Sequence, residues 1–411
     1  MLNWTRWSVI LRLNRFQPLE RPAKEAIGNR MSEYPWWQPE TGETERRLIN
    51  EVLDNNFLNE GETTRRFEEA LSERLGCDYC VAVTSGTAAL FAALYGLGVG
   101  PGDEVILPDL TFIATANAVT WTGATPVLVD IEPDRLTIDP AAVRRAITSR
   151  TKAIVPVHLS GRAADMQTIL VIAKEHDLFV VEDAAEALLS KSSGQCLGTF
   201  GNAGCFSFSP MKTIQTGQGG AVVTNNQELA HRLCEIKDQG RRGRGTGGND
   251  LHYAVGFNFK LTNLQAAIGL GQLEQLDRRI ARLREIYSAY ETGLRNIAGI
   301  DLPGFDLEGG ECPQWVDALS DRRDELHGFL ADRQMGSRPF WYPLHTQDPY
   351  RQNATSFPNS VKLAARALWL PSAFTLVPEQ IMTVCDAIRS FSNGAEKVPA
   401  NRPVLTGVGQ Q

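Results

Sequence analysis

The stretch CFSFSPMKTIQTGQGGAVVT, residues 205–224, places a single lysine between two short runs that are typical of β-strands. The runs are residues 205–208 and residues 221–224, and the glycines between them permit backbone angles that other residues resist. The pattern predicts that this lysine, Lys212, lies on a loop held between two strands. Taken by itself, the residue is either a solvated surface charge, as most lysines are, or a positioned amine.

Around this loop, short apolar runs alternate with helical patterns from about residue 80 to about residue 225. EVILP (104–108), for example, precedes the helical pattern FIATANAVTWTG, and LFVVED (178–183) follows the helical pattern MQTILVIAKEH. This alternation is typical of parallel strands joined by helical crossovers. The sequence therefore predicts an α/β fold with a large, mostly parallel sheet.

Helical periodicity over residues 260–298 predicts a long helical bridge from this large domain to a smaller one. The rest of the chain mixes helical patterns with strands near residues 337–341, which predicts a small α+β domain. The predicted division is an N-terminal extension at 1–30, a large domain at 31–299, a small C-terminal domain at 300–392 and a flexible tail at 393–411.

The bulk composition argues against several classes of protein. The 411 residues are 43% hydrophobic and 22% charged, which is ordinary for a soluble globular protein. A net charge of −7 argues against broad nucleic-acid binding, and the apolar runs are shorter than the roughly 18 residues of a membrane span. Seven scattered cysteines favour the reducing cytoplasm, and the CxxC pair Cys77 and Cys80 is interpreted as buried or incidental rather than as a metal or redox site.

Two further segments carry candidate chemistry. VTSGTAAL, residues 83–90, predicts a strand, a turn and then a helix. The start of that helix would offer unpaired backbone N–H groups to a phosphate, while the plainer interpretation is an ordinary N-cap. Asp183 ends the apolar run LFVVED, at the sheet edge where open α/β folds bind ligands. Its carboxylate suits a protonated ring nitrogen, and a helix N-cap is again the alternative.

Lys212, Asp183 and the helix start at residues 85–88 together match the requirements of pyridoxal phosphate. This cofactor needs an amine for its aldehyde, a carboxylate for its pyridinium nitrogen and a seat for its phosphate. Other sites are less well supported. The six histidines show no metal-ligand spacing, and GRGTGG (243–248) lacks the context of a dinucleotide fingerprint. The sequence therefore predicts pyridoxal 5′-phosphate as the cofactor and no metal.

The same segments resemble those of a known family. From about residue 34 to about residue 391 the chain is similar to the DegT/DnrJ/EryC1/StrS group of pyridoxal-phosphate aminotransferases, which act on nucleotide-linked keto sugars. The ordered set of motifs is more specific than any one of them. It comprises GTAAL, GDEVILPDLTFIATANAV, PVHLSGRAADM, VVEDAAEA, CFSFSPMKTIQTGQGGAVVTNN, GFNFKLTNLQAAIGLGQLEQL and YPLHTQDPY.

The resemblance implies a type I, aspartate aminotransferase-like fold that works in the cytoplasm as a homodimer with active sites at the subunit interface. Lys212 matches the Schiff-base lysine, Asp183 the partner of the pyridine nitrogen, and Phe112 the aromatic residue stacked on the cofactor ring. Asn258 matches an asparagine that reaches the phosphate from the other subunit. The phosphate contacts, with the rest of the helix start, are expected at Ser85, Gly86, Thr87, Ala88 and Ser207.

One position departs from the family pattern. Where the family often has a glutamine that hydrogen-bonds the cofactor's phenolic oxygen, this chain has Glu186. Because two anions in contact repel, Glu186 is expected to be protonated or to share the cofactor's proton, unless it turns away. Members that resemble perosamine synthases tolerate glutamate there, which favours a 4-keto-6-deoxyhexose acceptor. Lys212 argues against the 3-dehydratase branch, in which histidine replaces the lysine.

Substrate contacts are expected in two segments. Arg241 and Arg244 lie in a glycine-rich segment, and they either contact the nucleotide diphosphate or belong to a solvated basic loop. By resemblance, Tyr342 and His345 face the sugar site. The predicted activity is amino transfer from L-glutamate to a nucleotide-linked 4-keto-6-deoxyhexose, for polysaccharide or amino-sugar biosynthesis. The alternatives are a 3-keto-sugar acceptor and a regulatory member of the fold that does not turn over.

Overall fold

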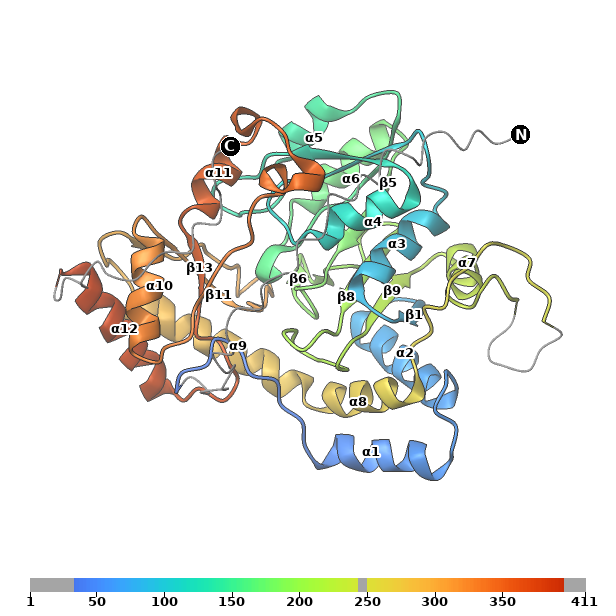
Figure 1. The fold of residues 1–411 in the computed structure, drawn as a ribbon, viewed down its shortest axis with the longest axis horizontal. Helices are drawn as coiled ribbons and strands as arrows, with labels where there is room; N and C mark the ends of the chain where they lie inside the picture. Colours follow the sequence, from blue (N-terminus) through green and yellow to red (C-terminus); the bar gives the residue numbers. More distant parts are fainter. Residues whose placement is uncertain (1–32, 243–249, 395–411) are drawn as a thin grey trace, which may run out of the picture. The chain divides into compact units, whose positions relative to one another are not determined.

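The computed structural model describes residues 33–242 and 250–394, and a seven-stranded sheet lies at the centre of this part of the chain (Figure 1). Neighbouring strands run parallel except at β9, which is antiparallel to both of its neighbours. The predicted, mostly parallel sheet is confirmed. In spatial order the strands are β1 (Tyr79–Val83), β9 (Gly220–Thr224), β8 (Ala203–Ser207), β5 (Phe179–Asp183), β4 (Thr151–Ile154), β2 (Glu104–Pro108) and β3 (Thr125–Val129).

Helices cover both faces of this sheet. Helix α3 (Gly86–Gly96) begins directly after β1, and Ser85 caps it, because the Ser85 Oγ accepts a hydrogen bond from the Ala88 backbone N–H at 3.1 Å. Apolar residues run all the way round α3, as expected for a helix with no solvent face. The other helices of these layers are α2 (Glu62–Leu75), α4 (Ala114–Thr122), α5 (Pro140–Ala146), α6 (Met166–Glu175) and α7 (Gln227–Lys237), while α1 (Glu43–Asp54) lies outside them.

The alternation of side chains along each strand divides the core between the two faces. On β1, Val81 and Val83 are buried in one cluster with the side chains of α3 and α7. The residues that alternate with them, Cys80 and Ala82, are buried on the other face with Phe67 of α2. The same period of two governs β5, and it decides where the acidic residues at the end of that strand point.

The helical bridge predicted over residues 260–298 consists of two helices. They are α8 (Asn263–Glu274) and α9 (Leu276–Gly293), and they meet at Gln275, whose backbone (φ −96°, ψ 0°) leaves the α-helical region. The break allows α8 to pack against α1 and α2, while α9 continues to a second sheet (Figure 1).

The second sheet has four antiparallel strands in the order β10 (Ile300–Asp301), β11 (Val316–Ser320), β13 (Ala367–Leu370) and β12 (Arg338–Pro339). It shares a hydrophobic core with α9, α10 (Arg323–Asp332) and α12 (Pro378–Ser392). The domain boundary near residue 300, where β10 begins, stays a prediction. The short elements of the described residues are β6 (Lys191–Ser192), β7 (Gln195–Cys196), α11 (Pro358–Ala364) and the 3-10 turns η2 (Leu159–Gly161), η3 (Leu344–Thr346), η4 (Asp348–Tyr350) and η5 (Ala354–Ser356).

Several sequence predictions concern residues that the structure does not describe: the extension at 1–30, the tail from residue 395 onward, and Arg244. Within the described ranges, no helix combines the length and the apolar character needed to cross a bilayer. The same ranges contain no group of three or more histidine, cysteine, aspartate or glutamate side chains arranged to hold a metal ion.

Candidate active site

Lys212 lies on the loop between β8 and β9, as the sequence predicts. Its Nζ is 3.1 Å from Oε1 of Glu186, and its side chain is only 13% exposed. The other oxygen of Glu186, Oε2, accepts a hydrogen bond from the Ser160 backbone N–H at 2.9 Å. Glu186 therefore does not turn away from the site; it faces the lysine directly.

Asp183 is the last residue of β5 and is buried beside this pair. Its Oδ2 accepts a hydrogen bond from the Thr115 hydroxyl at 2.8 Å, and its Oδ1 accepts one from the Ala185 backbone N–H at 3.2 Å. Burial raises the pKa of Asp183, and the Thr115 hydrogen bond and the charge of Lys212 oppose that rise. A cationic partner in the site would therefore stabilise this carboxylate in its charged form.

Glu186 experiences a similar balance of forces. Burial raises its pKa above the ordinary value for a glutamate, and the positive charge of Lys212 is the largest opposing effect. The nearby charge of Asp183 pushes the pKa in the same direction as burial. The net direction is upward. That Glu186 holds or shares a proton when it faces the cofactor stays a prediction.

The start of α3 packs tightly against the ends of β8 and β9. A Cβ atom built on Gly86 would lie 2.8 Å from the Cβ of Ser207, and one built on Gly220 would lie 2.4 Å from the Ser85 carbonyl oxygen. Only glycines permit this close approach. The packing brings the Ser207 side chain next to the first turn of α3, which contains half-buried Thr87.

The segment before β11 contacts the Lys212 loop, and the sequence did not predict this contact. Gln314 contacts both neighbours of Lys212: its Nε2 donates to the Met211 carbonyl at 3.2 Å, and its Oε1 accepts from the Thr213 hydroxyl at 2.7 Å. The ring of Trp315 lies 4.9 Å from Lys212 Nζ. Because these contacts join residues about 100 positions apart, no local pattern indicates them.

Ser160 links this segment to Glu186. Its backbone adopts a left-handed conformation (φ 53°), which is uncommon for a residue other than glycine. Its N–H donates to Glu186, and its carbonyl accepts from the Gln314 N–H at 2.8 Å. Its hydroxyl donates to Asp317 at 2.9 Å. One residue in an unfavourable conformation thus connects both sides of the site.

The residue before Asp183, Glu182, points to the opposite face of the sheet and has a structural role. Its two oxygens accept hydrogen bonds from three backbone N–H groups of residues 198–201 at 2.7 Å. His158 completes the arrangement: its Nδ1 accepts from the Ala164 N–H at 3.2 Å, so its Nε2 carries the proton that it donates to Glu182 at 2.9 Å.

A cleft of about 690 Å³ contains two of the predicted site residues, Phe112 and Tyr342. Phe112 precedes α4, and its ring centroid is 6.0 Å from that of Trp341. Tyr342 is 77% exposed. His345 differs from both, because it is buried and its Nδ1 is 2.7 Å from an Asp109 carboxylate oxygen. The described contacts of His345 are structural, and its contact with a substrate stays a prediction.

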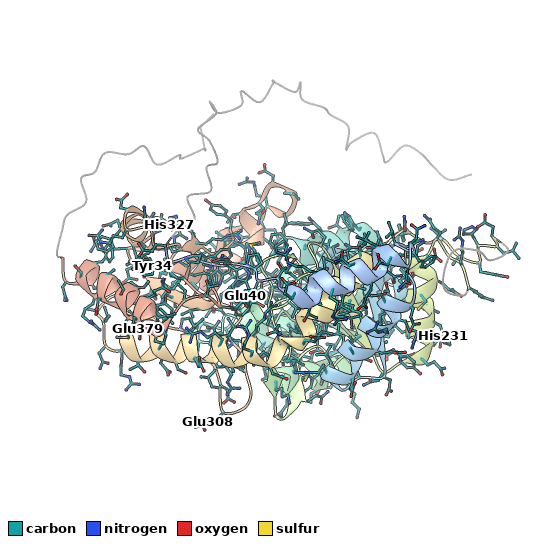
Figure 2. The ribbon with its side chains drawn as sticks, turned by 90° about the horizontal axis from the view of Figure 1, so that it is seen from below. Tyr34, Glu40, His231, Glu308, His327 and Glu379 are labelled. Carbon is teal, nitrogen blue, oxygen red and sulfur yellow. The ribbon has the colours of Figure 1, made fainter. Side chains whose placement is uncertain are left out.

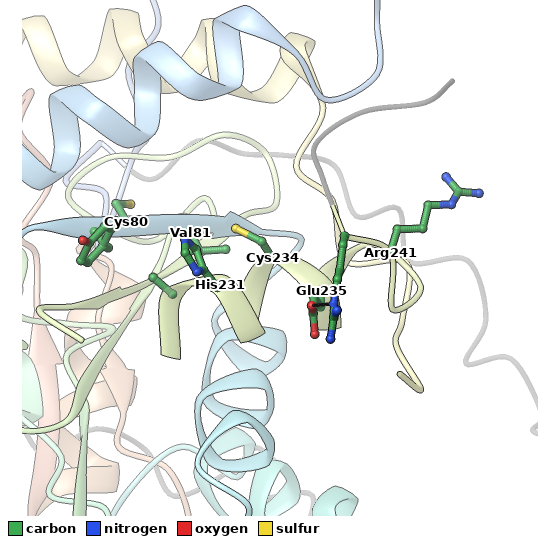
Figure 3. A pocket seen from close by; sticks show the side chains of 9 residues that line it. Cys80, Val81, His231, Cys234, Glu235 and Arg241 are labelled. Atoms are coloured by element: carbon green, nitrogen blue, oxygen red, sulfur yellow. Dashed lines mark hydrogen bonds and ion pairs between the residues drawn. The ribbon is translucent and has the colours of Figure 1, made fainter. Parts of the chain in front are cut away.

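Arg241 and Asn258 are placed around Asp238 rather than around Lys212. Arg241 lies 3.8 Å from an Asp238 oxygen, and Asn258 forms a β-bridge with Asp238. Figure 3 shows Arg241 at the rim of a pocket next to α7 and pointing away from Glu235. Figure 2 labels His231 of this pocket and His327 of the cleft at opposite sides, so the pocket and the cleft are separate. Substrate contact by Arg241 and phosphate contact by Asn258 stay predictions.

Comparisons with known proteins identify the family of this chain. Residues 39–389 match the model of the DegT/DnrJ/EryC1/StrS aminotransferase family. A protein of Escherichia coli O157:H7 named GDP-perosamine synthase is 38% identical over 366 residues, which cover 88% of this chain and 99% of that protein.

Two solved structures extend the comparison. The first is DesV from Streptomyces venezuelae in complex with a ketimine intermediate, with 36% identity and a TM-score of 0.81 over 86% of this chain and 95% of that one. The second is the PLP form of Spr1654 from Streptococcus pneumoniae, with 25% identity and a TM-score of 0.83 over 88% and 99%. These neighbours confirm the type I fold. The chain belongs to the DegT/DnrJ/EryC1/StrS family of pyridoxal-phosphate-dependent aminotransferases.

Proposed function

We propose that this aminotransferase moves an amino group from L-glutamate to a nucleotide-linked 4-keto-6-deoxyhexose. The contact that carries the proposal is the one between Lys212 Nζ and Glu186, 3.1 Å apart and beside the buried Asp183. The named activity of the E. coli relative, GDP-perosamine synthase, supports an acceptor of this class. In the overall reaction the keto oxygen of the sugar is exchanged for the amino group, and L-glutamate becomes 2-oxoglutarate.

The residues present fit pyridoxal phosphate. The first turn of α3 and Ser207 would hold the phosphate, because a helix start offers unpaired N–H groups to an anion. Asp183 would face the ring nitrogen, Lys212 would reach the aldehyde, and Glu186 would face the phenolic oxygen. Phe112 would cover the ring. When bound, the cofactor supplies an aldehyde that takes up the amino group and a ring that accepts electrons.

The protein groups then have separate tasks. Lys212, as a neutral amine, removes the proton from the α-carbon of the donor and later returns a proton to the carbon that receives the amino group. Glu186 lies within reach of Lys212 Nζ, so the amine and the carboxylate can share a single proton between them. Asp183 would keep a proton on the ring nitrogen of the bound cofactor. The hydrogen bonds that it accepts from Thr115 and Ala185 fix its carboxylate for that task.

The site is proposed to be completed by a second copy of the chain, which would contribute Asn258 and the arginines near it. Asn258 is exposed, and the preceding residues Tyr253 and Val255 leave much of their apolar surface in solvent, 53% and 72%. An exposed apolar strip of this kind next to a predicted phosphate ligand suits a contact between two subunits.

The experiment that tests the proposed function is the visible absorption spectrum of the purified protein, recorded before and after addition of L-glutamate. We expect a band of lysine-bound cofactor that disappears with glutamate and returns with a GDP-linked 4-keto-6-deoxyhexose. If the band returned only with 3-keto sugars, the acceptor would be a 3-keto sugar instead of a 4-keto-6-deoxyhexose. A protein without any band after addition of pyridoxal phosphate would contradict the assignment of Lys212.

A further inference from the structure

Two arginines line the cleft that contains Phe112 and Tyr342, and they differ in their partners. The Arg323 guanidinium is already engaged, with Asp324 at 2.8 Å and with the Ala364 carbonyl at 2.7 Å. Arg338 forms no ion pair with any carboxylate of the described residues. Arg338 is therefore the cation of this cleft whose charge is available to a ligand.

Aromatic rings hold the guanidinium of Arg338 in place. Its Cζ atom lies 5.1 Å from the ring centroid of Trp36 and 5.6 Å from that of Trp369. Trp315, which contacts Lys212 Nζ, packs against both of these rings at centroid distances of 5.7 Å and 4.8 Å. Lys212 and Arg338 thus rest on the same tryptophan cluster, one in the buried site and the other in the cleft.

Among the described residues, the side-chain hydrogen-bond acceptor of this guanidinium is a weak one. Nη1 of Arg338 is 3.4 Å from the sulfur of Met211, the residue before Lys212. A thioether accepts hydrogen bonds poorly. A ligand can therefore accept hydrogen bonds from the five N–H donors of Arg338 without displacing a strong acceptor of the described residues. Another cleft residue, His327, is hydrogen-bonded to Ser337 at 2.8 Å, and burial lowers its pKa, which leaves it uncharged at neutral pH.

We propose that Arg338 binds an anionic oxygen group of a substrate in this cleft. Carboxylates and phosphates match the planar fork of a guanidinium, which donates two parallel hydrogen bonds to either group. Within the proposed function, on which this inference rests, the two sources of such a group are a carboxylate of the amino donor and a phosphate of the nucleotide.

The test uses the cofactor-loaded protein and three variants. Arg338→Met keeps an apolar stem over the tryptophan rings but removes the charge, and Arg338→Lys keeps the charge but removes the fork. Arg323→Met is the matched control, because its guanidinium lines the same cleft with its partners already satisfied. Calorimetry gives the dissociation constants of 2-oxoglutarate and of GDP, and the visible spectrum gives the half-saturating concentration of L-glutamate.

We expect Arg338→Met to weaken one of the two probes by about tenfold or more, Arg338→Lys to weaken it less, and Arg323→Met to change it by less than about twofold. Weaker binding of 2-oxoglutarate assigns Arg338 to the donor carboxylate, and weaker binding of GDP assigns it to the nucleotide phosphate. Unchanged constants for both probes in both Arg338 variants would overturn the inference. A wild-type protein whose spectrum ignores glutamate would refute the proposed function instead, and the binding constants would still decide the role of Arg338.

Discussion

The buried group around Lys212 and the open cleft around Arg338 are organised in opposite ways. In the buried group, Asp183 and Glu186 both accept hydrogen bonds from the chain itself, and Lys212 is almost enclosed. In the cleft, Tyr342 is largely exposed and Arg338 has no acidic partner among the described residues. The difference teaches that groups which move protons are fixed before a ligand arrives, whereas groups which recognise it are left for the ligand to satisfy.

The largest effect is expected from removing the amine of the buried group. Lys212→Ala should lower kcat/KM by at least about 10⁴-fold, because the variant lacks both the covalent attachment point and the base. Steady-state kinetics with L-glutamate and the keto sugar measure this loss, and the band of lysine-bound cofactor should vanish. Lys362→Ala, on the surface of α11, is the control. Turnover within tenfold of the wild type would remove Lys212 from the mechanism.

A smaller effect is expected when the contact that holds the Lys212 loop is cut. Gln314→Ala should lower kcat by about tenfold while leaving the KM for glutamate unchanged, and the lost hydrogen bonds should cost about 1–3 kcal/mol of stability. The pH at which the visible band changes should shift, because Lys212 is less well positioned. Gln195→Ala, which removes a comparable but exposed side-chain-to-backbone hydrogen bond at the start of β7, is the control. A fall in stability with kcat and band unchanged would make Gln314 purely structural.

The smallest effect is a change in how stability depends on pH. Burial raises the pKa of Glu186, so between the unfolded and the folded pKa the folded chain holds more protons, and stability falls as pH rises through that window. Glu186→Gln removes this slope. The melting temperature of the cofactor-free variant, relative to wild type, should therefore increase as pH rises from about 4.5 toward neutral. An unchanged difference across that range would mean that Glu186 is charged in the folded chain throughout.

Much of the buried group follows from local sequence, and much of the cleft does not. LFVVED predicts a buried strand with an acidic residue at its end, and β5 ends at Asp183 as expected. The loop position of Lys212 follows from the strands on either side. Local patterns did not indicate Gln314, because its role depends on contacts between residues about 100 positions apart. They also did not show that His345 is buried while Tyr342 is exposed. The contact of His345 with Asp109, and with it the burial of His345, depends on tertiary packing.

The break between α8 and α9 shows a similar limit. The helical periodicity of residues 260–298 predicts a helical bridge but not its break. The packing of α8 on two neighbouring helices and of α9 on the second sheet accompanies the break at Gln275. Periodicity reports which residues are helical, and it carries little information about where two helices meet different partners.

The adjacent acids at the end of β5 have a consequence for how this chain can change over evolution. Glu182 anchors a turn on one face of the sheet, and Asp183 belongs to the candidate site on the other. Because the side chains of a strand alternate between faces, inserting or deleting one residue in β5 would exchange the two positions. The anchor would then face the cofactor and the functional acid would face the turn. The strand therefore cannot gain or lose a single residue without exchanging these two roles.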